Sequence, residues 1–164
     1  MPIITISGTP IAFPDSGESP NWSEAIIAFA EAVEQALSGI VGPYDVPPQV
    51  LNIDAYNVVT DQPITALQFP VLLVRAFTVT YAVYREGDSP TTHLSEAGEF
   101  TAVYDPDNSS GSKWSVTRMA TAPGANIEFS VSDAGAVSFT TTAVGTINHT
   151  GTISFSAKAI LQQD

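Results

Sequence analysis

Cysteine is absent from the 164 residues of the chain. The protein therefore has no disulfide, no thiolate ligand for zinc or an iron–sulfur cluster, and no cysteine nucleophile. Basic residues are also scarce, with 5 Lys and Arg against 17 Asp and Glu and a net charge of -12. Because nucleic acids and anionic membranes repel so acidic a chain, we expect neither of them as a partner.

Long hydrophobic runs are missing as well. The longest fully apolar run covers residues 25–30, which is too short to cross a bilayer. Residues 1–8 lack the basic and apolar regions of a signal peptide. We therefore expect neither a transmembrane segment nor export by the ordinary secretory route.

Charge of either sign is low. Charged residues make up 13% of the chain, about half of what is usual in a soluble domain, whereas hydrophobic residues make up 44%. The apolar content favours a folded chain over a disordered one, and the length of 164 residues favours one compact domain. With so few charges, the surface must hold many neutral side chains, and we expect partners to cover part of it.

The N-terminal segment, residues 1–21, is rich in both proline and apolar residues. Its prolines exclude a regular helix. We expect an extended arm that docks on another surface, and the alternative is an edge strand of the protein's own sheet. The apolar side chains that would make the contact are Ile3, Ile4, Ile6, Ile11 and Phe13.

Residues 22–38 are predicted to form an amphipathic helix. Asn21 can cap its start, Glu24 follows three residues later as in a capping box, and Gly39 marks its end. The apolar face is expected to pack on a sheet of the same chain or on the same helix of a neighbouring subunit. It is formed by Trp22, Ala25, Ile26, Phe29, Val33, Ala36 and Leu37. Besides the apolar residues of the arm, the candidate assembly contacts are Trp22, Ile26, Phe29 and Val33.

A proline-rich connection at residues 39–49 separates the helix from a β-rich region at residues 50–164. Apolar and polar residues alternate there, as in half-buried antiparallel strands, and turn residues separate the runs. We predict a mainly β fold: a jelly-roll-like antiparallel β-sandwich of about eight strands with one N-terminal α-helix and an extended N-terminal arm. Strands and helices do not alternate, which disfavours Rossmann and α/β-barrel enzymes. The inward positions are expected at Phe77, Val79, Tyr81 and Val83; Trp114, Val116 and Arg118; Ile127, Phe129 and Val131; and Ile153, Phe155 and Ala157.

Residues that carry chemistry are few and lie in no recognisable motif. The two histidines, His93 and His149, are 56 positions apart and match no metal or nucleophile pattern. Asp105, Asp107 and Asn108 could offer oxygen ligands to calcium, but they lack the glycine and the distal glutamate of an EF-hand loop. A plain turn is the favoured interpretation of that segment.

Two patterns of enzymes or lectins are weighed and set aside. A carboxylate pair for glycoside hydrolysis could come from Glu86, Glu96, Glu99 and Glu128, but 17 acids make a coincidental pair nearly certain. A carbohydrate-stacking surface could come from aromatic residues, for which packing is the commoner use. Those aromatic residues are Trp22, Tyr44, Tyr56, Tyr84, Tyr104 and Trp114. We therefore assign no catalytic, cofactor-binding or metal-binding residue and expect no cofactor and no enzymatic activity.

Two groups of short phrases resemble small virion structural proteins of tailed bacteriophages. The first group is FPDSGESPNW at 13–22, VPPQ at 46–49 and IDAYN at 53–57. The second group is KW at 113–114, IEFSV at 127–131, DAGAVSF at 133–139 and TGTISFSAKA at 150–159. Together they cover nearly the whole chain and include no catalytic signature.

The resemblance implies a non-enzymatic virion protein assembled in the bacterial cytoplasm. Small phage proteins of this build serve as trimeric decoration (cement) proteins of the head, as head fibres, or as parts of the tail and its fibres. We expect a homotrimeric decoration protein bound to the outside of the capsid, with the major capsid protein as its partner. The alternative is a tail-fibre or receptor-binding module, and the remote alternative is a glycan-acting β-sandwich enzyme.

Overall fold

The computed structural model describes residues 3–6, 9–12, 22–38, 42–88, 93–109, 111–121, 124–145 and 148–162. Within the helix, side chains are described from Ala25 to Val33. The chain divides into two compact units, residues 1–43 and residues 44–164, where the sequence led us to expect one compact domain. Each unit has its own packed elements, so we treat them separately.

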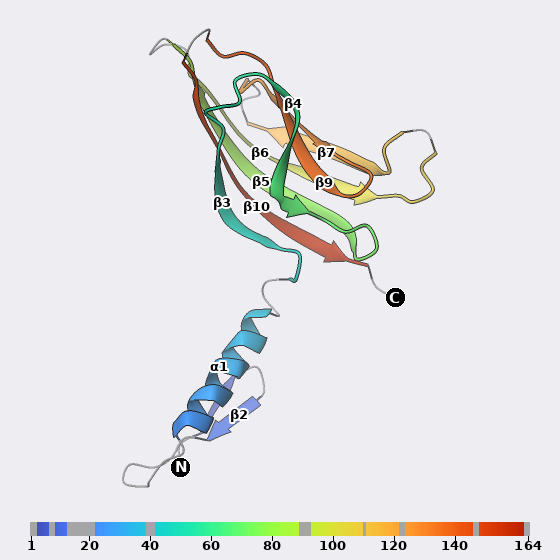
Figure 1. Ribbon diagram of the computed structural model, residues 1–164. Helices are drawn as coiled ribbons and strands as arrows, with labels where there is room; N and C mark the ends of the chain where they lie inside the picture. Colours follow the sequence, from blue (N-terminus) through green and yellow to red (C-terminus); the bar gives the residue numbers. More distant parts are fainter. Residues whose placement is uncertain are drawn as a thin grey trace. The chain divides into compact units, whose positions relative to one another are not determined.

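The first unit contains a β-hairpin and one helix (Figure 1). β1 (Ile3–Ile6) pairs antiparallel with β2 (Thr9–Ala12), so that Ile3 lies opposite Ala12. α1 runs over Trp22–Ser38, the range that the sequence predicts. We expected an extended arm or a strand of the main sheet, and the described part of the segment instead pairs with itself. This pairing satisfies backbone groups that an arm would leave to a partner.

The second unit confirms the predicted mainly β fold, with eight strands in two antiparallel sheets (Figure 1). The larger sheet has the order β3-β10-β5-β6-β7, and the smaller one has the order β4-β9-β8. The strands are β3 (Val46–Asn52), β4 (Val59–Gln68), β5 (Val74–Glu86), β6 (His93–Tyr104), β7 (Trp114–Ala120), β8 (Ile127–Val131), β9 (Ala136–Thr141) and β10 (Thr150–Leu161).

The first strand of the sandwich begins inside the segment expected to be a proline-rich connection. β3 starts at Val46 and contains Pro47 and Pro48. Proline cannot donate a ladder hydrogen bond, and it is therefore confined to edge strands. β3 is such an edge, since it pairs only with β10 in the larger sheet, and this position explains why the two prolines do not prevent the strand.

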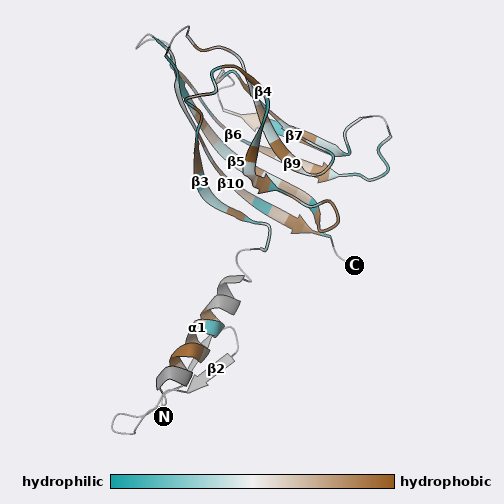
Figure 2. Cartoon of the chain, viewed as in Figure 1, coloured by the Kyte–Doolittle hydropathy of each residue, from teal (hydrophilic) through white to brown (hydrophobic). Residues whose placement is uncertain are grey.

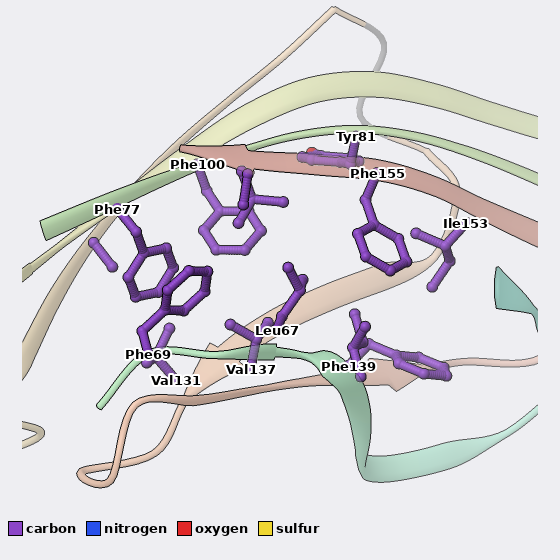
Figure 3. Packing of buried hydrophobic residues seen from close by; sticks show 14 of the residues in the cluster. Leu67, Phe69, Phe77, Tyr81, Phe100, Val131, Val137, Phe139, Ile153 and Phe155 are labelled. Carbon is purple, nitrogen blue, oxygen red and sulfur yellow. The ribbon is translucent and has the colours of Figure 1, made fainter. Parts of the chain in front are cut away.

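Alternating side chains fill the space between the two sheets. In β5, Phe77, Val79, Tyr81 and Val83 are all buried, as their spacing predicts. In Figure 3, Phe77 of β5 and Phe100 of β6 point toward the smaller sheet, where Val137 and Phe139 lie. Burying large apolar side chains stabilises each by about 1.5–3 kcal/mol before ordering costs, so this core supplies the main driving force for folding the second unit.

Aromatic rings join the sheets at several points. Phe69, which follows β4, stacks on Phe77 of β5 with ring centroids 3.8 Å apart. Phe100 of β6 stacks on Phe129 of β8 at 5.2 Å. Trp114 lies 5.1 Å from Phe77 at a tilted angle. The predicted use of the strand aromatics in packing is therefore observed at these positions.

The edge strand β7 departs from the predicted burial pattern. Trp114 is buried, but Val116, two residues further on the same face, is 42% exposed. Five strands face only three, and β7 is the outermost of the five. An inward side chain at this edge is therefore covered only in part by the opposite sheet, which periodicity alone does not reveal.

Candidate functional site

The structure places the arm's candidate assembly contacts on the hairpin of the first unit. β1 carries Ile3, Ile4 and Ile6, and β2 carries Ile11. Phe13 lies outside the described residues. Their role in assembly stays a prediction.

Small residues of α1 are buried, and the helix packs on β1 and β2. Ala25 is 8% exposed and Ala32 is 5% exposed. They lie seven positions apart, two turns along one face of the helix. Val33, next to Ala32, is half-buried, and Trp22 is the first residue of the helix. Alanine at the contact permits a close approach of helix and hairpin.

The large side chains of the same helix point elsewhere. Ile26 is 58% exposed and Ile27 is 56% exposed, and Phe29 is 39% exposed. Figure 2 shows the described part of α1 carrying a hydrophobic band. A helix that buries alanines and exposes isoleucines leaves apolar surface for a partner. Of the predicted apolar face, Ala25 is therefore buried and Ile26 is exposed.

A polar cluster lies between the sheets around Glu96 of β6. Its Oε1 accepts a hydrogen bond from the Tyr81 hydroxyl at 2.7 Å and forms an ion pair with the Arg118 guanidinium. Its Oε2 accepts from the backbone N–H groups of Gly124 and Ala125 at 3.2 and 3.4 Å. Because both carboxylate oxygens are engaged, Glu96 fixes the chain before β8 to the sheet and is not a free general acid or base.

Arg85, at the end of β5, is completely buried. Its Nη1 donates to the carbonyls of Ala125 and Asn126 at 2.9 and 2.8 Å. Its Nη2 donates to the carbonyls of Asn57 and Thr142 at 2.8 and 2.9 Å. Burial lowers the pKa of the Arg85 guanidinium, which nevertheless stays charged. The side chain therefore ties three loops to one end of the sandwich.

His149 extends this network toward β10. The Arg85 Nε–H donates to His149 Nε2 at 3.2 Å, which leaves Nδ1 as the donor to the Asp54 carbonyl at 3.1 Å. The Gly151 N–H donates to Asp54 Oδ1 at 2.6 Å, and this bond lowers the pKa of the Asp54 carboxyl. His149 therefore acts as a structural connector at this end of the molecule, in keeping with its place in no metal or nucleophile motif.

The other acids proposed for glycoside hydrolysis do not form a free pair with Glu96. Glu99 lies exposed on β6, and Glu86 accepts a hydrogen bond from the Tyr84 hydroxyl at 3.0 Å, a bond that raises the pKa of Tyr84. Glu128 lines a pocket of about 440 Å³ together with Glu96. In that pocket the oxygens of Glu96 are already bonded, so Glu128 is the acid open to solvent.

The segment weighed for calcium binding is built as a turn. Asp105 Oδ1 accepts the N–H of Asp107 at 3.1 Å, and the Asp105 carbonyl accepts the N–H of Asn108 at 3.3 Å. An aspartate that bonds to the backbone two residues on forms an Asx turn. Over the part of the chain that the structure describes, no group of three His, Asp or Glu side chains is placed to hold a metal.

The outward face of the larger sheet holds two shallow apolar grooves that the sequence analysis did not identify. One runs over β3, β10 and β5 beside Val50 and Ser154, and the other runs over β5, β6 and β7 beside Met119. Both share Thr80 and Ala97, so they meet at the centre of the face. In the sequence, small side chains at outward strand positions could have indicated these grooves.

Comparison with protein-family models gives no match, and comparison with curated proteins gives none either. Among solved structures, the chain resembles a tailspike protein, gp49 of the Acinetobacter baumannii bacteriophage Fri1, described as a capsular polysaccharide depolymerase. The TM-score is 0.43 at 10% sequence identity, and the match covers 70% of this chain and 19% of the tailspike. A likeness at this level assigns no function. Over the described residues, no helix is long and apolar enough to span a membrane.

Proposed function

We propose that the protein is a non-enzymatic structural component of a phage virion, a homotrimeric decoration protein held on the outside of the capsid. The observation that carries this proposal is a difference in packing between the two units. A sandwich with a complete core needs no partner to fold, whereas the first unit exposes Ile26 and Ile27. The first unit is thus suited to attachment and the second to display.

The size of the first unit supports the same assignment. It has 43 residues, Met1–Pro43, and chains of about 40 residues usually need disulfides, metals or oligomerisation to be stable. The protein has no cysteine. Association through the exposed side of α1, with other copies and with the major capsid protein, would stabilise this unit.

The distribution of aromatic residues favours decoration over receptor binding. A tail-fibre or receptor-binding module would group exposed aromatic side chains at one end of the sandwich, where sugars stack on them. Of the aromatic residues that the structure describes in the second unit, Tyr84 alone is exposed. Tyr104 and Trp114, weighed for sugar stacking, pack against each other with centroids 5.2 Å apart.

The experiment is to count copies on intact particles and to weaken the attachment surface. We expect hundreds of copies at lattice positions on the head, and loss of most of them in an Ile26→Asp, Ile27→Asp variant. Leu72→Asp is the control, because Leu72 is also an exposed apolar residue but lies in a turn of the second unit. A count in the teens, or density at the tail, would overturn the decoration role, and full occupancy of the double variant would overturn attachment through α1.

A further inference from the structure

Open sheet edges attract other strands, and the sandwich has four edge strands, β3 and β7 in the larger sheet and β4 and β8 in the smaller one. Three of them are protected in the ways that natural proteins use. β3 carries Pro47 and Pro48, and β4 carries Pro63 and two register shifts. β8 is five residues long, and its Ile127 carbonyl accepts from Arg118 Nη1 at 3.0 Å.

The fourth edge, β7, has none of these protections. It pairs with β6 in an unbroken register from Trp114 to Ala120 and contains no proline. Its one charged side chain, Arg118, bonds Tyr81 and Glu96 and therefore does not guard the edge. A seven-residue, regular and unguarded edge is a template for pairing with another strand.

The backbone groups that β7 offers can be identified from the ladder. The Asp105 N–H donates to the Lys113 carbonyl at 2.8 Å, and the Thr121 N–H donates to the Ala97 carbonyl at 2.9 Å. Groups alternate along an antiparallel strand, so the odd-numbered residues of β7 bond to β6 and the even-numbered ones face away. Within the described structure, the outward N–H of Val116 donates no hydrogen bond and its C=O accepts none.

The side chains at this edge are apolar on both faces of the sheet. Val116 is 42% exposed on the inward face, and Met119 is 69% exposed on the outward face beside one of the two grooves. Residues 113–122 contain no acid, in a chain with 17 acids and a net charge of -12. Copies of this chain repel one another over most of their surface, but not along this edge.

We propose that β7 pairs antiparallel with β7 of a second copy across a two-fold axis at Thr117, which joins two larger sheets edge to edge. Thr117 is the middle residue of the strand Trp114–Ala120, so this register pairs the whole strand. It places Val116 opposite Arg118 of the second copy, and both residues present outward backbone groups to each other. Thr117 then lies opposite Thr117 of the second copy, and a cross-strand threonine pair is favourable in sheets.

The neighbouring registers are poorer. An axis at Arg118 would pair only residues 116–120. An axis at Val116 would pair only residues 114–118. The two-fold contact uses the second unit, whereas the proposed three-fold association uses the first, so the two together would link trimers into a larger network.

Cross-linking tests the axis directly, because the chain has no cysteine of its own. Residues opposite each other in a non-hydrogen-bonded pair have Cα atoms about 4.5 Å apart, which permits a disulfide. We expect Thr117→Cys to form a covalent dimer under mild oxidation. Ser154→Cys, an exposed position on the outward face of β10, is the matched control and should stay uncross-linked. No dimer with Thr117→Cys, or equal dimer with both variants, would overturn the proposal.

A second variant tests the backbone contact. Val116→Pro removes an outward N–H and no bond to β6, so the sheet should keep its fold, which near-ultraviolet circular dichroism can verify. In a Thr117→Cys, Val116→Pro chain we expect the rate of cross-linking to fall about tenfold or more. An unchanged rate would refute strand pairing. These measurements use the purified chain, so their failure leaves the virion role, measured on particles, unaffected.

Discussion

At the scale of single residues, Arg85 is the most consequential polar side chain of the sandwich. Its guanidinium is completely buried and is held by carbonyl oxygens and a histidine. A buried charge without a carboxylate partner persists only because its donors are fully used. This arrangement makes the loops at one end of the sandwich depend on one side chain.

Replacing Arg85 should therefore be costly. We expect Arg85→Ala to lower the free energy of unfolding by about 3 kcal/mol or more, because several buried carbonyls lose their donors at about 1–3 kcal/mol each. Arg75→Ala is the matched control, an exposed arginine on the same strand, and should change stability by less than about 0.5 kcal/mol. Urea unfolding of the two variants measures the difference, and equal effects would contradict the role of Arg85.

Asp54 should make stability depend on pH in acid. Its pKa is lowered in the folded state by the Gly151 N–H, so the ionised form is favoured by folding. The stabilisation is complete above the unfolded pKa of about 3.9 and is lost as the pH falls through the lower folded value. We expect wild type to lose more stability between pH 5 and pH 3 than Asp54→Asn does, in urea unfolding at each pH.

The control for Asp54 is Asp107→Asn. Asp107 is exposed, and its carboxylate accepts no hydrogen bond within the described structure. This variant should therefore retain the acid sensitivity of wild type. If Asp54→Asn also retains the acid sensitivity of wild type, the bond from Gly151 does not control the loss of stability between pH 5 and pH 3.

At the scale of elements, α1 shows why an apolar pattern does not say which residues a helix buries. The face predicted from spacing includes both alanine and isoleucine, and the structure buries Ala25 and exposes Ile26. The helix packs on β1 and β2, and close packing of a helix on a hairpin is easiest where side chains are small. The larger residues are then left for contacts outside the unit.

This packing predicts that replacing alanine by leucine has different effects at two positions of α1. Ala32→Leu adds a bulky side chain at a contact where Ala32 is 5% exposed and should destabilise the first unit by about 1–3 kcal/mol. Ala28→Leu places the same side chain at an exposed position of the same helix and should leave stability nearly unchanged. Thermal loss of helical circular dichroism separates them, and equal melting of the two variants would show that α1 does not pack on the hairpin through Ala32.

At the scale of the whole molecule, the question is how copies associate. The proposed three-fold contact uses α1 and the proposed two-fold contact uses β7, so each can be tested after the other is disabled. The mass of one chain is 17.2 kDa, which makes the stoichiometry easy to read by light scattering.

With β7 disabled by Val116→Pro, we expect the purified chain to have a mass near three times that of one chain. Adding Ile26→Asp and Ile27→Asp should reduce it to a single chain, because charged side chains cannot be buried in an apolar contact without a large desolvation cost. Adding Leu72→Asp instead should leave the trimer intact. A monomer before the helix is altered would contradict the trimer.

The fold class follows from local sequence pattern. Period-two alternation in residues 76–83 depends only on which side chains avoid water, and the structure buries those positions as predicted. The helix at Trp22–Ser38 was equally predictable, because its caps and its 3.6-residue period are local. The same alternation, continued from Val83 by two residues, would have placed Arg85 inside the sandwich.

Long-range packing sets the features on which the proposed assembly depends. Which strand lies at an edge follows from long-range pairing, so the openness of β7 and the partial exposure of Val116 cannot be read from local pattern. The partners of Arg85 come from segments 28 to 64 positions away, and the packing of α1 on its own hairpin likewise depends on long-range contacts. Local propensity depends on each residue and its neighbours in the sequence, whereas these contacts depend on which distant segments have complementary surfaces.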